Sequence, residues 1–355
     1  MIEEELELGT VDLGFAEKCE PWKLQSHFFP SKIGGKPAWL NLQDIPSADR
    51  VQCRVCQGPC IFLCQVYAPI ESQDECFHRT IFIFICPNVD CCLPNQSDNF
   101  KVLRCQLSRR NDFFSVNPPV ESPHTLPERR VEELTKVCRV CNLKGTSHCG
   151  KCRNVNYCSR EHQVADWRAG HKLECAANEV NPQRPLPLLL PEWEIETEPE
   201  PDIDDLRGGK VERSDEEKLK EYESLVNAGK AGTLHDTSVD ADLNAMAGEK
   251  EDQIFKKFKK RISEMPKQIL RYEKDGTPLW VCGINQPTSI PPCEYCGNER
   301  TFEFQVLPQM LNYLSLDQVG KSIDWGTLAV FTCKNSCSSG DTYKAEYIFK
   351  QDILQ

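Results

Sequence analysis

Eight residues with metal-binding side chains lie within 38 consecutive positions in the middle of the chain. They form four spaced pairs, two Cys-x2-Cys, one Cys-x3-His and one His-x3-Cys: Cys138, Cys141, Cys149, Cys152, Cys158, His162, His171 and Cys175. Thiolate and imidazole ligands at these spacings suit tetrahedral zinc, and eight ligands make two closed sites. Because so short a segment cannot bury a sufficient apolar core, the metal must supply folding free energy.

Two further sets of four cysteines flank this segment. Each set consists of a Cys-x2-Cys pair, two apolar runs typical of a β-hairpin, and a second cysteine pair, which is the plan of a zinc ribbon. The sets are Cys53, Cys56, Cys86 and Cys91 on the N-terminal side and Cys293, Cys296, Cys333 and Cys337 on the C-terminal side. Cys91 and Cys92 compete for one ligand position, and we prefer Cys91 because its spacing from Cys86 is nearer to that of the last pair.

The two flanking segments are related by an internal repeat. At an offset of 240, five residues coincide: Cys53, Cys56, Phe62, Gln65 and Val66 with Cys293, Cys296, Phe302, Gln305 and Val306. At an offset of 241, Gly35-Lys-Pro-Ala-Trp39 parallels Gly276-Thr-Pro-Leu-Trp280. Identities in the same order in both halves indicate a duplication.

Isolated two-stranded hairpins are marginal in water, so two related halves have an evident solution in packing against each other. We therefore predict an α+β fold in which residues 13–115 and 265–355 form one split, pseudo-symmetric, zinc-braced β domain with the finger looped out between them. The alternative is two independent ribbons on a flexible string. The predicted segments are 1–12 (disordered), 13–115 (N-terminal half), 116–135 (linker), 136–177 (two-zinc finger), 178–248 (proline-rich and acidic linker, mostly disordered) and 249–355 (amphipathic helix and C-terminal half).

Two helices are predicted in the last segment. Apolar residues from Ile254 to Met265 form one stripe of a 3.6-residue period, and Pro266 ends that helix. Its lysine-rich remainder suits a solvated face better than a nuclear signal or a nucleic-acid site. A short helix is expected near Pro308. Before these helices, alternating residues from Trp193 to Thr197 could add to the sheet as an edge strand.

Charge is concentrated in the acidic linker. Of the net charge of −12, residues 192–252 contribute −13 (20 acidic and 7 basic side chains), whereas residues 136–175 carry +5. A chain with this balance is a poor non-specific nucleic-acid binder and a plausible partner for a basic protein. No apolar run approaches the roughly 18 residues of a membrane span. The acidic N-terminus does not resemble a secretory signal, and 21 cysteines without such a signal indicate metal ligands in the cytosol or nucleus.

Catalytic motifs are hard to find. The sequence contains no dinucleotide-binding glycine pattern, no complete phosphate-binding G-x4-G-K-S/T loop and no nucleophile elbow. Four protein ligands on each metal leave no position for an activated water. We therefore expect a protein that is not an enzyme.

The middle segment resembles the MYND zinc finger through Tyr157-Cys158-Ser159, Gln163, Asp166-Trp167, His171 and Cys175. The resemblance implies interleaved sites: one zinc on Cys138, Cys141, Cys158 and His162, the other on Cys149, Cys152, His171 and Cys175. His162 departs from the family, which usually has Cys there. The resemblance also implies that Gln163 and Trp167 line a groove for proline-containing peptides. Alternatively, Trp167 only covers the small core of the finger.

The flanks resemble the programmed cell death protein 2 family. The resemblance is carried by 13–17, 29–40, 65–69 and 77–79 in the first half and by 268–272, 311–314 and 320–326 in the second. It implies a chaperone for a basic small-subunit ribosomal protein of the uS5 type in 40S ribosome assembly, located in cytoplasm and nucleus and associated with proliferation and apoptosis. It is consistent with two zinc ions in the finger and two more in the flanking halves.

Two other functions are compatible with the sequence. The first is a nuclear adaptor whose MYND groove recruits corepressor proteins in transcription and apoptosis. The second is direct DNA binding by the finger, which its positive charge allows but for which no recognition helix is evident. Replacing Gln163 and Trp167 would separate an adaptor from a chaperone that works through the β domain.

Overall fold

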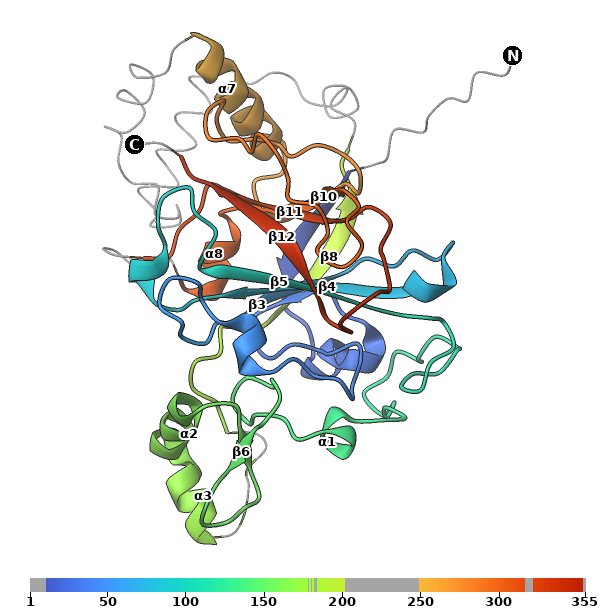
Figure 1. Ribbon diagram of the computed structural model, residues 1–355, viewed down its shortest axis with the longest axis vertical. Coiled ribbons are helices and arrows are strands. Elements are labelled where there is room, and N and C mark those ends of the chain that lie inside the picture. The colour runs from blue at the N-terminus through green and yellow to red at the C-terminus, as the bar shows by residue number, and fades with distance from the viewer. Residues whose placement is uncertain are drawn as a thin grey trace.

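Ten strands drawn from both ends of the chain close into one barrel, with the finger at one end and a long helix at the other (Figure 1). The computed structural model describes residues 11–177, 179, 181, 184–201, 249–316 and 322–353. The barrel strands are β1 (Asp12–Glu17), β2 (Lys32–Ile33), β3 (Ile61–Tyr67), β4 (His78–Ile85), β5 (Phe100–Leu107), β8 (Trp193–Pro199), β9 (Gln268–Tyr272), β10 (Arg300–Val306), β11 (Thr327–Cys333) and β12 (Lys344–Gln351).

Each half of the chain contributes a four-stranded meander, β2-β3-β4-β5 and β9-β10-β11-β12. The meanders meet where β5 pairs antiparallel with β12, with Arg104 opposite Lys344. On the other side β1 and β8 complete the circle, because β1 pairs with both β8 and β9. The two halves therefore share one sheet, as the split β domain requires, and two independent ribbons are incompatible with this ladder.

The halves repeat each other in detail. The β3–β4 ladder has a register shift between Phe62 and Cys64, and the β10–β11 ladder has one between Phe302 and Phe304, which are the same positions at the repeat offset of 240. Gln65 Oε1 accepts a hydrogen bond from the Ala38 backbone N–H at 2.9 Å. In the other half, Gln305 Oε1 accepts one from Leu279 at 2.6 Å. A shared bulge and a shared buried amide contact are structural signs of duplication.

The central strands are buried on both faces, which explains why they read as continuous apolar runs. In β4 the side chains of Ile81 and Ile83 belong to one apolar cluster and those of Phe82 and Phe84 to another. Inside the fold, Arg79 of β4 and Glu303 of β10 form a fully buried ion pair, with Nη1–Oε1 at 2.5 Å and Nη2–Oε2 at 2.7 Å. Since β4 and β10 are not neighbours in the barrel, this pair connects the two halves directly.

Two helices cover the C-terminal half where the sequence predicted them. Helix α7 (Glu249–Glu264) buries Phe258 and Ile262 against Val281 and Leu307. Helix α8 (Met310–Leu314) buries three apolar side chains, Met310, Leu311 and Leu314. The apolar stripe of α7 is thus a packing face, and its lysines lie on the opposite side.

Strand β8 is part of the barrel wall and pairs with β1 on one side and β2 on the other, so the expectation of an edge strand is wrong. The acidic linker was predicted to begin before it, and residues 202–248 of that linker lie outside the described residues. The chain segment just before β8 passes close to Gly34, which has φ +65°. A Cβ atom on Gly34 would lie 1.8 Å from the Pro191 carbonyl oxygen, so only glycine fits there.

Gly34→Ala is expected to destabilise the fold by at least about 2 kcal/mol, because it combines a left-handed conformation with a backbone clash. The change would be measured by urea unfolding. Gly150→Ala is a matched control, since a Cβ there meets nothing within 4 Å. Equal unfolding curves for both variants would contradict the packing of the 190–193 segment against Gly34.

The finger packs against the barrel. It contains β6 (Ser147–His148), β7 (Asn156–Tyr157), α2 (Arg160–Asp166), a helical turn at Trp167–His171 and α3 (Lys172–Ala177), with α1 (Val131–Leu134) before it. The Trp39 indole N–H donates to the Asn142 carbonyl at 2.7 Å, and the Lys144 N–H donates to Pro46 at 3.0 Å. Finger and barrel side chains also share one apolar cluster. The finger is therefore an insertion, as predicted, but it is docked on the N-terminal half.

Candidate metal centres

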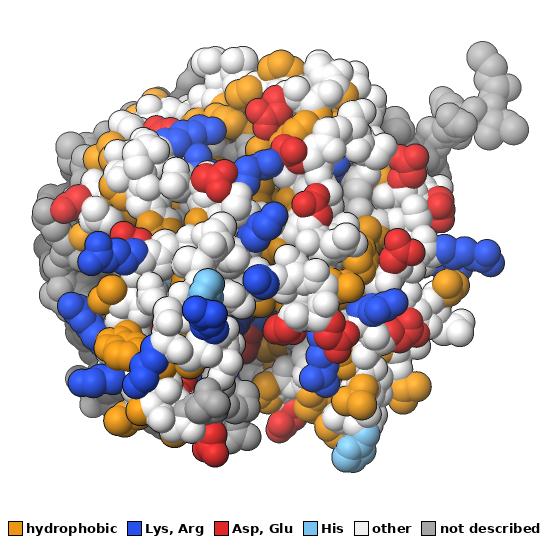
Figure 2. All heavy atoms as spheres, turned by 60° about the horizontal axis from the view of Figure 1, so that its bottom comes forward, with side chains coloured by type: hydrophobic (Ala, Val, Ile, Leu, Met, Phe, Trp, Pro, Cys, Tyr) orange, Lys and Arg blue, Asp and Glu red, His pale blue; other side chains and the backbone are white. Residues whose placement is uncertain are grey.

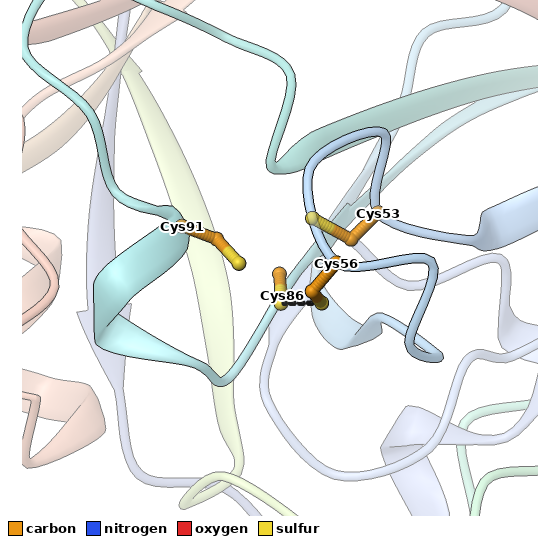
Figure 3. Close-up of side chains that lie close together, drawn as sticks. All are labelled: Cys53, Cys56, Cys86 and Cys91. Atoms are coloured by element: carbon orange, nitrogen blue, oxygen red, sulfur yellow. Dashed lines mark hydrogen bonds between the residues drawn. The ribbon is translucent and has the colours of Figure 1, made fainter.

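The structure brings together each of the four predicted ligand sets. Within every set, the four ligand atoms lie within 4.8 Å of one another: Cys53, Cys56, Cys86 and Cys91; Cys138, Cys141, Cys158 and His162; Cys149, Cys152, His171 and Cys175; Cys293, Cys296, Cys333 and Cys337. In the first set the side chains converge from a loop, from the end of β4 and from a helical turn (Figure 3). The finger sets interleave as the MYND resemblance implies.

All four Cys-x2-Cys knuckles share one backbone turn. The residue after the second cysteine is left-handed in each case, with φ between 60° and 73°, and its N–H donates to the carbonyl of the first cysteine at 2.8–3.0 Å. These residues are Gln57, Asn142, Arg153 and Gly297. Three of the four are not glycine, so the turn keeps a left-handed backbone conformation that is strained for these residues. Apart from the Cys-x2-Cys pairs themselves, no sequence pattern indicates this shared turn.

The spacing of the ligand atoms fits tetrahedral zinc. Zinc–sulfur bonds of about 2.3 Å in a tetrahedron place sulfur atoms about 3.8 Å apart. The sulfur pairs lie at 3.6 Å (Cys56–Cys86), 3.5 Å (Cys141–Cys158), 3.8 Å (Cys149–Cys175), 3.7 Å (Cys293–Cys337) and 3.6 Å (Cys296–Cys333). All four clusters are therefore compatible with zinc, and four protein ligands close each of them.

The histidines of the finger face their clusters through different nitrogens. His162 presents Nδ1, which lies 3.6 Å from Cys138 Sγ, and His171 presents Nε2, which lies 3.6 Å from Cys152 Sγ. Ser159 caps α2 and accepts the His162 backbone N–H, which fixes the first turn of that helix beside Cys158. Imidazole thus replaces the usual sixth thiolate without disturbing the cluster.

Local hydrogen bonds favour the thiolate form at one corner of each ribbon cluster. The backbone N–H of Asn298 lowers the pKa of Cys296 to about 6. The corresponding N–H of Gly58 lowers the pKa of Cys56. Burial raises the pKa of Cys333 and of Cys86, so these two thiols need a bound cation to ionise together with the first. A zinc ion at the centre would supply that charge and brace the loops.

Cys91, and not Cys92, lies in the first ribbon cluster. The Cys92 thiol instead lies 3.2 Å from the carbonyl of Asp324, on the C-terminal half. The spacing comparison that preferred Cys91 therefore agrees with the geometry.

Gln163 and Trp167 lie one helical turn apart and are both partly exposed. The Trp167 N–H donates to the Gln163 carbonyl, and the Trp167 ring makes an edge contact with His171 at 5.8 Å between centroids. Trp167 also packs on the finger cluster. The residue therefore covers the core of the finger while remaining partly accessible.

Metal analysis of the purified chain is expected to give four zinc ions per chain, one for each cluster. Cys296→Ser combined with Cys337→Ser should reduce the content to three, because two remaining thiols bind zinc too weakly. A content of two in the unmodified chain would show that only the finger is metallated.

Together, the duplicated barrel and its closed clusters define a zinc-finger protein with a MYND-type finger, and residues 138–175 match the MYND finger family. Residues 10–121 and 252–352 match the N-terminal and C-terminal domains of programmed cell death protein 2. The chain belongs to the programmed cell death protein 2 family, which is not a known enzyme family.

Relatives match the chain along most of its length. Programmed cell death protein 2 of Bos taurus is 43% identical over 97% of each chain. Programmed cell death protein 2-like of Homo sapiens is 28% identical over 86% of this chain and 85% of its own. A Schizosaccharomyces pombe protein named "Probable 20S rRNA accumulation protein 4" is 22% identical over 93% of this chain and 92% of its own.

No solved structure matches the fold. Among the described residues, no helix has the length and apolar character needed to cross a membrane.

Proposed function

We propose that this protein is a non-enzymatic, zinc-braced chaperone for a basic small-subunit ribosomal protein of the uS5 type, acting in 40S assembly in cytoplasm and nucleus. The observation that carries the proposal is the full-length similarity to a relative named for 20S rRNA accumulation. The specific client follows from the family resemblance in the sequence. Zinc in this proposal is structural, since each cluster is closed by protein ligands.

The barrel offers an acidic surface suited to a basic client. On β8, Glu196 and Glu198 are exposed and Glu194 is half-buried. Glu194 lies opposite Glu17 of β1 in the ladder, so two glutamates are paired directly across the strands. Like charges opposite each other are destabilising, and a basic partner would relieve the repulsion. The row sits on a rigid barrel strand, which gives it a fixed shape.

The finger end of the molecule has a different character. Figure 2 turns this end toward the viewer and shows Lys and Arg side chains interspersed with Asp and Glu, without one continuous basic surface. Such a mixed surface gives little of the phosphate attraction on which DNA binding depends. The accessible edge of Trp167 instead supports the second candidate, a nuclear adaptor that binds corepressor peptides.

The test is the affinity of the purified protein for a purified uS5-type ribosomal protein across a salt series. Changing Glu194, Glu196 and Glu198 to Gln should weaken binding by about fivefold or more and flatten its salt dependence. Changing Glu121, Glu128 and Glu132 to Gln is the matched control, because these exposed carboxylates lie outside β8, in the chain segment that connects β5 to the finger. Salt-independent binding that is equal in both variants would remove the acidic strand from the proposal.

A further inference from the structure

A network of buried charges lies against the second zinc centre of the finger. Asp166 is fully buried and accepts hydrogen bonds from the Tyr157 hydroxyl at 2.8 Å and from Arg184 Nη2 at 2.5 Å. Glu174 is mostly buried and accepts from Arg184 Nε at 2.7 Å and from Arg139 Nη2 at 3.2 Å. The Arg184 guanidinium therefore hydrogen-bonds both carboxylates, whereas Arg139 hydrogen-bonds Glu174 and lies 3.6 Å from Asp166.

Glu174 in turn faces a metal-ligand histidine. His171 directs Nε2 into its cluster, so Nδ1 is on the outer side of the ring. That Nδ1 is buried, makes no hydrogen bond, and lies 3.6 Å from Glu174 Oε2. Zinc-bound histidines typically donate this second N–H to a carboxylate, which fixes the tautomer and the orientation of the ring. Glu174 is placed for that role.

Arg184 lies beyond the C-terminal end of the finger as the finger is recognised in the sequence. The family match ends at 175, and the last helix, α3, ends at Ala177. The arginine nevertheless lies against the turn before His171, where a Cβ on Gly170 would come within 2.9 Å of Arg184 Cδ. Gly170 has φ +146°, and its missing side chain leaves the space that the arginine fills.

We propose that Arg184 is a positioning residue of the second zinc centre, acting through Glu174 on His171. The guanidinium holds the carboxylate at the outer nitrogen of the ligand and neutralises the buried Asp166 beside it. Without Arg184, Glu174 keeps only Arg139 and is free to turn away from the ring. The functional finger therefore extends to residue 184, only a short distance before β8 of the barrel begins at Trp193.

The test uses the zinc-loaded full chain and follows zinc transfer to a chelator. Arg184→Ala and Glu174→Gln should each accelerate release of one zinc per chain by about tenfold or more, as loss of an outer-shell partner typically does. The double variant should be no faster than either single variant, because both act on one contact. Arg184→Lys should be intermediate, since ammonium cannot span both carboxylates. Arg168 is an exposed arginine on the helical turn that contains His171, and Arg168→Ala should have no effect on zinc release.

Nitrogen-15 NMR of labelled histidines separates positioning from general unfolding. In Arg184→Ala the Nδ1–H signal of His171 should exchange faster with water while the signals of His162 stay unchanged. Release at the unmodified rate, additive effects of the two substitutions, or equal acceleration of both finger zincs with loss of the His162 signals would overturn the proposal.

Discussion

Glu303→Gln is expected to destabilise the barrel by about 3–5 kcal/mol, because it leaves the Arg79 guanidinium buried without a counter-charge. Both side chains are fully buried, and Glu303 also accepts hydrogen bonds from Tyr272 at 3.0 Å and from Thr332. Burial alone would raise the pKa of Glu303, but the Arg79 charge outweighs burial and lowers that pKa to about 2. The ion pair joins the two halves of the chain, so its loss weakens the barrel as a whole.

The sign of the pH dependence follows from the lowered pKa. An unfolded glutamate titrates near 4.3, so the stabilisation is complete above that pH and is lost as pH falls toward 2. Urea unfolding at pH 7 therefore reports the full contribution. Glu299→Gln is the matched control, since Glu299 pairs with Lys334 in an exposed bridge that should be worth about 0–1 kcal/mol. Similar losses in the two variants would contradict a buried link between the halves.

Trp39→Ala is expected to cost about 3–5 kcal/mol and to release the finger from the barrel. The indole is 1% exposed and lies 5.1 Å from the rings of both Phe82 and Tyr343. Its N–H also makes the hydrogen bond to Asn142 that holds the first knuckle. Trp39→Phe would isolate that bond, with an expected loss of about 1–3 kcal/mol from the partly buried carbonyl left unpaired.

The internal repeat supplies the control for this prediction. Trp280 occupies the position related to Trp39 and packs on Phe349, yet it is only partly buried. Among the described residues its indole N–H makes no hydrogen bond to the finger or elsewhere. Trp280→Ala should therefore cost less and leave the finger docked. Limited proteolysis of the segment before residue 138 would report whether the finger is docked on the barrel. Equal cleavage of both variants would contradict the proposed role of Trp39 in holding the finger.

Ligand spacing predicted the four cysteine and histidine clusters because the chemistry is local. A Cys-x2-Cys pair determines one turn, and the partner pair must approach within about 4 Å for zinc to bind. The repeat at offset 240 correctly indicated a duplication, since Gln65 and Gln305 make the same backbone contact in their own halves. Helix α7 was predicted because a 3.6-residue stripe identifies a packing face without reference to its partner.

Features that depend on closure could not be predicted in the same way. The pairing of β5 with β12 joins residues more than 200 positions apart, and the sequence of neither strand specifies which strand it pairs with. Strand β8 has the alternation of an edge strand, but closing the barrel surrounds it on both sides. Arg184 stands alone in a proline-rich stretch, and only the fold brings it to Glu174.

Docking of the finger affects how its role is tested. Deleting it would uncover the apolar face around Trp39, so lost binding in a deletion would not distinguish a missing groove from a damaged barrel. Point substitutions at the two residues of the expected peptide site avoid this problem. Trp167→Phe keeps an aromatic ring over His171, and Gln163→Ala removes a partly exposed amide.

The most direct test of the central claim, that the barrel and not the finger holds the ribosomal client, is one affinity comparison. The dissociation constant for a uS5-type ribosomal protein would be measured for the unmodified chain, for Gln163→Ala with Trp167→Phe, and for the β8 variant with Glu194, Glu196 and Glu198 changed to Gln. We predict that the finger variant binds within about twofold of the unmodified chain, whereas the β8 variant binds about fivefold or more weakly. Loss of binding in the finger variant with full binding in the β8 variant would contradict the claim and favour the adaptor.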